Sequence, residues 1–261
     1  MDSNYVMLAD IPKYWGLNKG DVVLLSSDCL RLSVSCHKNK EVFDPNILID
    51  SIIDVLGENG TLLIPTYNWD FCHGLMFDYH KSLSQTGGLG RIALGRSDFK
   101  RTRHPIYSFA VWGKDQEYLF RMNNEDSFGS DSPFAYLEHK NAKQVIIDVS
   151  YNHCFTFTHY IEQKIGVPYR FVKVFTSQYK DEEGIVKEKA YSMYVRYLEL
   201  NVISDMSEMA KDMLREGSTK HIIINEIEYK VVDLKATGKL IESDILYNKS
   251  KKIAQYVGQN E

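Results

Sequence analysis

The chain has 261 residues, 44% of them apolar and 25% charged, which fits one large globular domain over residues 1–261 that can enclose a buried site. Its formal net charge of −4 and the lack of long blocks of one sign argue against a nucleic-acid partner. Neither a run of 18 apolar residues nor a signal-like N-terminal segment occurs, so we expect a cytoplasmic protein with no membrane partner.

Strand and helix patterns alternate in the first quarter of the chain. The apolar runs at 20–27 and 61–67 predict two buried strands. Residues 44–57 between them predict a helix, because Asp44 occupies the N-cap position, Pro45 follows at the first helical position, and apolar residues recur at helical spacing. A strand, a helix and a second strand with short links predict a right-handed parallel crossover and therefore an α/β core.

Residues 68–95 break this pattern with aromatic residues, two histidines and several glycines. Such a segment is typical of a surface excursion on the substrate side of a cleft. We expect four of its polar and aromatic residues to contact substrate, namely Asn68, Trp69, Asp70 and Asp78.

Further elements follow in the second half of the chain. We predict strands at 106–113 and 142–150 and helices at 131–140, 204–217 and 242–257. In the helix at 204–217, one apolar face is predicted to pack in the core, with Met206, Met209, Met213 and Leu214 on it. Residues 170–235 alternate aromatic and polar residues around charged turns, which predicts an antiparallel subregion beside the parallel core.

A histidine and a glutamate stand three residues apart on a helix predicted at 156–165. Spacing places His159 and Glu162 on one helix face, opposite the apolar residues Phe157 and Ile161. A carboxylate bonded to one imidazole nitrogen leaves the other nitrogen free to accept a proton near neutral pH. The pair is therefore a candidate general base.

The same spacing is compatible with a solvated helix face and with half of a metal site. A solvated helix face is the more common setting for a His-x-x-Glu pair. A zinc motif of the H-x-x-E-H kind would need histidine at the position of Gln163, so we expect no metal.

Two stretches suggest phosphate binding. The glycine-rich run at 86–95 resembles a phosphate loop, but it lacks the G-K-[ST] ending and follows no clear strand, so we discount it. Arginines and a lysine gather at 96–103, where they would suit a pyrophosphate or a phosphorylated ribose, or simply solvate a loop.

Five stretches, in order, resemble the aminoglycoside 3-N-acetyltransferase family, also called the antibiotic N-acetyltransferase family, over nearly the whole chain. They are "GDVVLLSSDCL", "VLGENGTLLIPTY", "GRSDFKRTRHPIYSFAVWG", "FGSDSPFAYL" and "TFTHYIEQKIGVPYR". The last is the most specific, because the family carries threonine, two residues, histidine, two residues and glutamate there, followed by Val-Pro-Tyr.

The resemblance implies a fold and a reaction. The fold is α/β, with a central mixed β-sheet flanked by helices, distinct from the GNAT acetyltransferases, and with an antiparallel C-terminal extension. The reaction is transfer of an acetyl or other short acyl group from acyl-CoA to the amine of an amino sugar. Acetyl-CoA or another short acyl-CoA would be the co-substrate, with no metal and no covalent acyl-enzyme.

The resemblance also implies roles for single residues. His159 matches the general base, Glu162 its orienting carboxylate, and Thr156 falls beside the thioester. The coenzyme A contacts would come from Ser26, Ser27, His104 and Ser108, and on charge from Arg96 and Arg103. This chain has Leu25 and Asp28 where the family usually has histidine and leucine around the paired serines, so Asp28 becomes a candidate contact for substrate.

Several acceptors and assemblies are compatible with these residues. The excursion is more aromatic than acidic, which favours a biosynthetic amino sugar, one that could be nucleotide-linked, over a polycationic drug. The alternative is an aminoglycoside antibiotic 3-N-acetyltransferase. A non-catalytic carbohydrate- or CoA-binding protein is the alternative from another class. The partners expected are small molecules, and a homodimer is a possible assembly.

Overall fold

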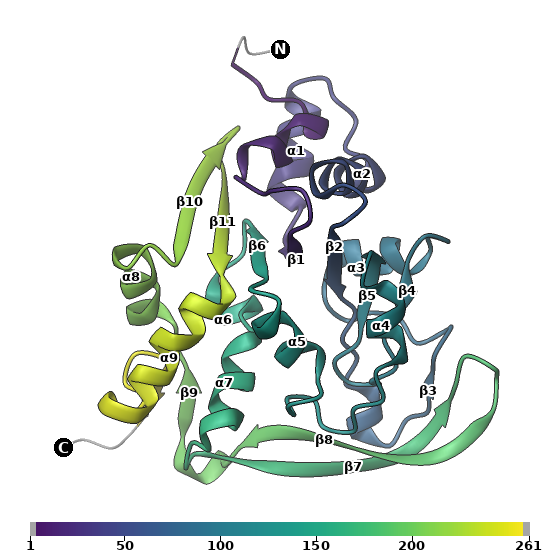
Figure 1. The fold of residues 1–261 in the computed structure, drawn as a ribbon, viewed down its shortest axis with the longest axis vertical. Coiled ribbons are helices and arrows are strands. Elements are labelled where there is room, and N and C mark those ends of the chain that lie inside the picture. Colours follow the sequence, from purple (N-terminus) through teal and green to yellow (C-terminus); the bar gives the residue numbers. More distant parts are fainter. Residues whose placement is uncertain (1–3, 258–261) are drawn as a thin grey trace.

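A seven-stranded sheet forms the centre of the molecule in the computed structural model, which describes residues 4–257 (Figure 1). The two ends of the domain predicted over 1–261 lie outside these residues. The strand order is β10-β11-β6-β1-β2-β5-β4. The middle strands β6, β1 and β2 run parallel, and antiparallel strands extend the sheet on both sides. The predicted mixed sheet and its parallel crossover are confirmed.

The strands and helices have the following bounds. The central sheet contains β1 (Val22–Ser27), β2 (Thr61–Pro65), β4 (Lys100–Arg101), β5 (Phe109–Gly113), β6 (Lys143–Ile147), β10 (Thr219–Ile224) and β11 (Ile227–Asp233). The other strands are β3 (Phe77–Asp78), β7 (Arg170–Lys180), β8 (Val186–Arg196), β9 (Val202–Ser204) and β12 (Ala254–Tyr256). The α-helices are α1 (Leu30–Lys38), α2 (Pro45–Leu56), α3 (Gly87–Leu94), α4 (Gln116–Arg121), α5 (Pro133–His139), α6 (Tyr151–Cys154), α7 (Phe157–Ile165), α8 (Ser207–Arg215) and α9 (Leu234–Asn248), and short 3-10 turns span Leu8–Tyr14, Asp70–His73 and Leu198–Leu200.

Successive residues of β1 pack into two different cores, as strand geometry requires. Val23 and Leu25 contribute to a core with α1 and α2, whereas Val22 and Leu24 contribute to a core with α5, α7 and α9. Helices therefore cover both faces of the central strands, which explains why β1 is apolar at nearly every position. None of the helices within residues 4–257 has the length and apolar character needed to cross a bilayer.

Local signals fixed two helices as predicted. The Asp44 side chain accepts the N–H of Asn46 at 2.8 Å at the start of α2, and the Ser132 side chain accepts the N–H of Ala135 at 3.3 Å at the start of α5. Helix α1 was not predicted. Its N-cap residue Cys29 makes no capping bond, and the carboxylate of Asp28 accepts the N–H of Leu30 instead, so the usual start signal is displaced by one residue.

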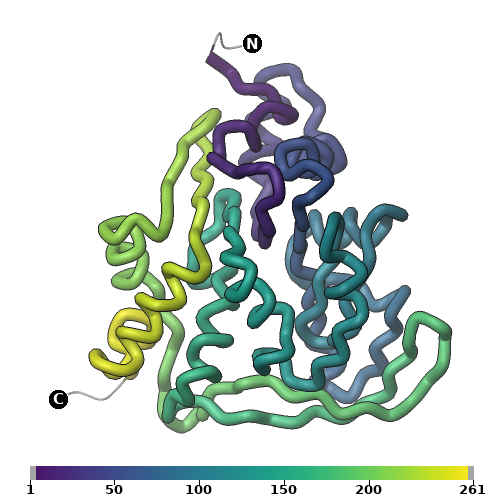
Figure 2. The backbone as a smooth tube through the Cα atoms, viewed as in Figure 1, coloured from purple at the N-terminus to yellow at the C-terminus, as the bar shows by residue number. Residues whose placement is uncertain are grey.

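The predicted antiparallel subregion at 170–235 divides among three sheets, because its short strand β9 pairs with β12 in a sheet of its own. The long ribbon of β7 and β8 runs along the base of the molecule and pairs with β3 in a separate sheet (Figure 1). Strands β10 and β11 instead join the central sheet beside β6. The described trace ends far from where it begins, with the first residues at the top of the tube view and the last at lower left (Figure 2).

Two predictions about the C-terminal helices were wrong in part. In α8, Met206, Met209 and Met213 are buried, but Leu214 is 48% exposed because it lies one position past the buried stripe. The closing helix α9 starts at Leu234, where the Asp233 side chain caps the N–H of Ala236 at 2.8 Å. It ends at Asn248, because positive φ angles at the next two residues turn the chain toward β12.

A buried arginine fastens the excursion at 68–95 to the sheet. Arg101 is only 4% exposed, and its guanidinium donates to the carbonyls of Ser82 at 2.5 Å and Thr66 at 3.1 Å. Its Nε donates to the Ser108 hydroxyl at 3.0 Å, and the group lies over the Phe77 ring. Burial lowers the pKa of Arg101 to about 10, which still leaves it charged near pH 7. We call these contacts of Arg101 the Arg101 clamp. They hold the excursion beside the end of β2.

Candidate active site

A cavity of about 680 Å³ lies at the carboxyl ends of β1, β2 and β6. Ligands of open α/β sheets bind outside the carboxyl ends of the strands, and the volume suits a small molecule. Six of the residues predicted for the site line this cavity: Ser26, Ser27, Asp28, Trp69, Thr156 and His159. Ser26 and Ser27 end β1, and Trp69 belongs to the excursion. Thr156 and His159 belong to the α6–α7 segment.

The imidazole of His159 is bonded to the carboxylate of Glu162. The Nδ1 atom lies 2.7 Å from Oε2, as the spacing of three along α7 allows. The Glu162 side chain is 1% exposed, whereas that of His159 is 25% exposed and borders the cavity. The alternative of a solvated helix face is therefore wrong, because the carboxylate lies inside the protein behind the imidazole.

Two further residues surround the Glu162 carboxylate. The Tyr169 hydroxyl donates to Oε1 at 2.9 Å, and the Arg170 Nε lies 2.8 Å from Oε2. Arg170 is itself buried, and its Nη2 donates to the Ser204 hydroxyl at 3.2 Å. Sequence reasoning missed both partners, although the stretch "GVPYR" at the end of the family motif contained them.

These surroundings set the protonation of the pair. Burial and the positive charge of Arg170 lower the pKa of His159 below 6.5, although the bond to Glu162 works in the opposite direction. Burial opposes ionisation of Glu162, but His159, Arg170 and Tyr169 together hold its pKa below 4.5. Near pH 7 the pair is therefore a carboxylate and a neutral imidazole whose Nδ1–H donates to it.

The second ring nitrogen of His159 is available to a ligand. With Nδ1 carrying the proton, Nε2 keeps its lone pair. Within residues 4–257, Nε2 makes no hydrogen bond. A base with a fixed tautomer and an unoccupied lone pair can take a proton from an amine in the cavity.

Cys154 also lines the cavity and is the thiol nearest to His159 in sequence. Burial raises the pKa of its thiol to about 12. The Sγ atom donates to the carbonyl of Ser150 at 3.3 Å. Because the thiolate is the reactive form, this thiol is poorly suited to form an acyl-enzyme near pH 7.

Three aromatic residues in mutual contact form an aromatic wall of the cavity. Tyr67 and Tyr107 pack edge to face with centroids 4.7 Å apart, and Trp69 lies 6.4 Å from each of them. All three line the cavity, and sequence reasoning found only Trp69. Among the described residues of the lining, Asp28 is the one carboxylate, and neither lysine nor arginine occurs.

The glycine-rich stretch discounted as a phosphate loop also forms part of the wall. It folds as α3, and residues 87–90 of its first turn line the cavity. A Cβ atom at Gly90 would lie 2.4 Å from the carbonyl oxygen of Pro65, so only glycine permits this approach of helix and strand.

Four residues predicted for coenzyme A lie outside the cavity lining. Arg96 is paired with Asp50 and Asp98 at 2.7 and 2.8 Å, and Arg103 with Glu182, so carboxylates neutralise both charges. His104 is buried, with Nδ1 accepting two backbone N–H groups, and burial lowers its pKa to about 3. Ser108 belongs to the Arg101 clamp.

Three residues predicted for substrate also lie outside the lining. Asn68 donates to the carbonyl of Leu83 at 2.9 Å. Asp70 accepts a bond of 2.9 Å from Gln85, which does line the cavity. Asp78 pairs with Lys180 at 3.2 Å. These polar groups order the excursion itself.

Within residues 4–257, no three or more His, Cys, Asp or Glu side chains are grouped so that they could hold a metal ion.

Comparison with known proteins gives one family match and several similar folds. The family model described as "Aminoglycoside 3-N-acetyltransferase" matches residues 36–243. In Bacillus subtilis, the SPbeta prophage-derived aminoglycoside N(3')-acetyltransferase-like protein YokD is 28% identical over an alignment of 173 residues, which covers 57% of this chain. The matched region spans 61% of the length of that relative.

The solved structures share the fold at low sequence identity. The crystal structure of YokD has a TM-score of 0.74 and 21% identity, covering 94% of this chain and 93% of its own. AAC-IIIb in a binary complex with CoASH has a TM-score of 0.74 and 18% identity, over 91% and 94% of the two chains. Sisomicin-bound AAC-VIa has a TM-score of 0.73 and 17% identity, over 91% and 96%.

The surroundings of Glu162 predict the effect of neutralising it. Glu162→Gln leaves the buried Arg170 without a counter-charge, so it should lower the free energy of unfolding by about 3 kcal/mol, measured by urea denaturation at pH 7. Glu117→Gln, at an exposed carboxylate paired with Lys100 and Arg121, should leave it near the wild-type value. Equal stability of wild type and Glu162→Gln would contradict the assigned burial of charge.

The stability difference between wild type and Glu162→Gln should also depend on pH. Because the folded-state pKa of Glu162 lies below 4.5, the unfolded chain binds the proton first as pH falls. The stability from the ionised carboxylate is thus present above about pH 4.5 and is lost below it. The gap between wild type and Glu162→Gln should therefore shrink as pH falls below that value.

Proposed function

Because the chain belongs to the aminoglycoside 3-N-acetyltransferase family, we propose that it transfers an acetyl or other short acyl group from acyl-CoA to the amine of an amino sugar. The observation that carries this proposal is the His159 imidazole, held by a buried carboxylate on one side and bordering the cavity on the other. The family member AAC-IIIb, described in complex with CoASH, supports the choice of acyl donor.

The base acts on the acceptor amine. An amine attacks a thioester only in its unprotonated form, and it carries a surplus proton once the C–N bond forms. His159 Nε2 takes that proton as the amine nitrogen bonds to the thioester carbon. Glu162 stabilises the resulting imidazolium through Nδ1–H. When the C–S bond breaks, the proton passes to the departing thiolate, which leaves neutral imidazole, the amide and free thiol.

Polar groups of the cavity would stabilise the oxygen during this attack. The thioester oxygen becomes an oxyanion in the tetrahedral intermediate and needs preorganised donors. Thr156, three residues before the base, and backbone N–H groups near Ser26 are the candidate donors. The high pKa of Cys154 favours direct transfer over an acyl-enzyme.

The cavity fits the neutral part of coenzyme A better than its phosphates. The pantetheine arm carries amides, which suit the hydroxyl and backbone groups along the end of β1 and the first turn of α3. No lysine or arginine occurs among the described lining residues, so the phosphates would lie outside the enclosed volume. Arg96 and Arg103 lie outside this lining and are paired with carboxylates, so their role as phosphate contacts stays a prediction.

The acceptor has two candidates. The family and its sisomicin-bound member favour an aminoglycoside. Asp28, the one carboxylate among the described lining residues, together with the aromatic wall, favours a biosynthetic amino sugar with few ammonium groups, free or nucleotide-linked. A polycation would leave most of its charges without partners there, whereas a sugar ring or a base stacks well on aromatic faces.

Replacing the base predicts a loss of turnover without a loss of binding. His159→Asn should lower kcat by a factor of about 10² to 10⁴, while the Kd of acetyl-CoA stays near the wild-type value. Thiol release measures the first quantity and calorimetry the second. The matched variant Cys154→Ala should stay within about twofold of wild type. A dead Cys154→Ala beside an active His159→Asn would overturn direct transfer.

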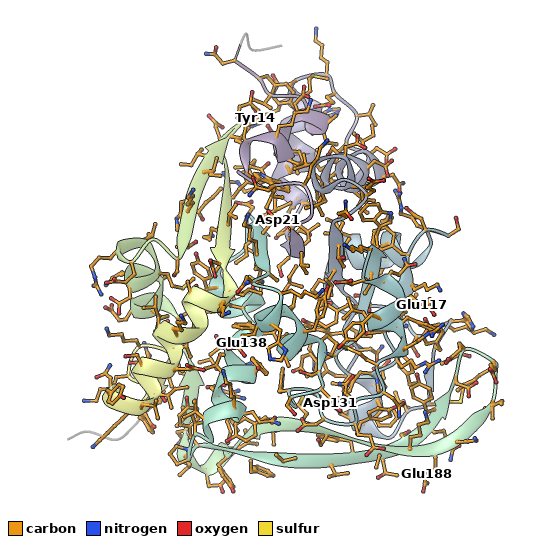
Figure 3. All side chains as sticks on the ribbon, viewed as in Figure 1. Tyr14, Asp21, Glu117, Asp131, Glu138 and Glu188 are labelled. Atoms are coloured by element: carbon orange, nitrogen blue, oxygen red, sulfur yellow. The ribbon has the colours of Figure 1, made fainter. Side chains whose placement is uncertain are left out.

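The acceptor choice predicts an order of substrates. In a thiol-release assay with acetyl-CoA, kcat/KM for amino-sugar nucleotides should exceed that for sisomicin by about tenfold or more, as one unpaired ammonium would cause. Asp28→Asn should raise the KM of the amine. Glu188→Gln, on the exposed ribbon of β8 (Figure 3), should not change it. Rapid turnover of sisomicin and none of the amino sugars would select the aminoglycoside.

A further inference from the structure

A buried glutamine lies beneath the cavity in β6. Gln144 is fully buried between apolar neighbours of the strand. Its Nε2 donates to the Ser26 hydroxyl oxygen at 2.9 Å and to the carbonyl oxygen of Cys154 at 3.2 Å. Its Oε1 has no hydrogen-bond partner among the described residues. Nothing in the sequence pattern marked this residue.

The two contacts fix which way the amide points. A backbone carbonyl can only accept, so the atom facing Cys154 must be the amide nitrogen. The flipped amide would set Oε1 against that carbonyl oxygen, which is repulsive. Because the same nitrogen faces Ser26, the serine oxygen accepts from Gln144, and the serine hydrogen must point elsewhere.

Ser26 lines the cavity, and its hydroxyl hydrogen has no acceptor among residues 4–257. A hydroxyl can donate or accept, and water or a ligand would normally choose. Because Gln144 already occupies one acceptor position of Ser26, the hydroxyl hydrogen is directed away from Gln144 and can be donated to a ligand in the cavity.

We propose that Gln144 is a positioning residue that holds the Ser26 hydroxyl as a hydrogen-bond donor to a carbonyl oxygen of the bound acyl donor. The inference rests on the proposed function, since acyl-CoA supplies the carbonyl. Two carbonyl classes have this chemistry: the thioester and the pantetheine amides. Through Cys154 the same amide also ties the end of β1 to the α6–α7 segment, which carries Thr156 and His159.

Equilibrium binding tests the inference without an acceptor. The Kd of acetyl-CoA and of CoA is measured by calorimetry for wild type, Ser26→Ala, Gln144→Met and the double variant. Ser26→Ala and Gln144→Met should each weaken acetyl-CoA binding by about two- to tenfold, the range of one hydrogen bond. In the Ser26→Ala background, Gln144→Met should change Kd much less, because the donor it orients is gone.

The comparison of acetyl-CoA with CoA identifies the carbonyl, and a control variant tests whether the effect is specific to Gln144. A loss confined to acetyl-CoA identifies the thioester carbonyl, and an equal loss with CoA identifies a pantetheine amide. Gln116→Met removes a glutamine that likewise donates to two acceptors, the carbonyls of Asp98 and Val111 at 2.7 Å each, but does not line the cavity; it should leave both Kd values unchanged.

The outcomes that would overturn the inference are distinct from failure of the proposed function. If the loss of acetyl-CoA affinity in the double variant equals the product of the two single losses, Gln144 does not act through Ser26 and is merely structural. If Gln144→Met does not fold, Ser26→Ala alone decides, and unchanged acetyl-CoA affinity there rejects the donor. Wild type that binds neither acetyl-CoA nor CoA would reject the acyltransferase function, and the inference with it.

Discussion

The Glu162 carboxylate is the charge around which the site is arranged. An ionised carboxylate without water is costly unless several donors surround it. Here His159 comes from the same helix, and Tyr169 and Arg170 come from the chain just beyond it. This requirement ties α7 to the start of β7. As a consequence the imidazole has one nitrogen held inside the protein and one left at the cavity.

The cavity itself depends on two other constraints of the fold. Parallel strands end together, so the serines at the end of β1 and the α6–α7 segment after β6 meet at one edge of the sheet. Trp69 and the first turn of α3 come from the excursion, which the Arg101 clamp holds against the end of β2. The site thus combines a rigid polar floor with an aromatic wall, which suits a reaction between an extended acyl donor and a ring-shaped acceptor.

Much of the fold could be predicted from the sequence because its signals are local. Asp44 and Pro45 define the start of α2 within two residues, and apolar runs define the parallel strands. Helix α1 escaped because its capping carboxylate stands one residue early. Leu214 was assigned to the buried face from spacing near that of its neighbours, and only the packing of α8 shows where that face ends.

The site was predictable where chemistry and spacing coincide. His159 and Glu162 were found because contact at three residues is a property of any helix, but the burial that gives the pair its character depends on Tyr169 and Arg170. Arg96 and Arg103 show the converse. A cluster of positive residues in sequence predicts an anion site only if carboxylates from elsewhere in the fold do not pair with them. Here Asp50 pairs with Arg96 and Glu182 with Arg103.

The assignment of a single domain and the homodimer stay predictions.

The tautomer of His159 is the most direct measure of the central claim that the buried carboxylate prepares a base. Nitrogen-15 NMR of labelled protein at pH 7, with the signal assigned by His159→Asn, distinguishes a protonated from an unprotonated ring nitrogen. The account predicts a neutral ring with the proton on Nδ1 and the lone pair on Nε2. A ring protonated on Nε2, whether neutral or as imidazolium, would contradict it.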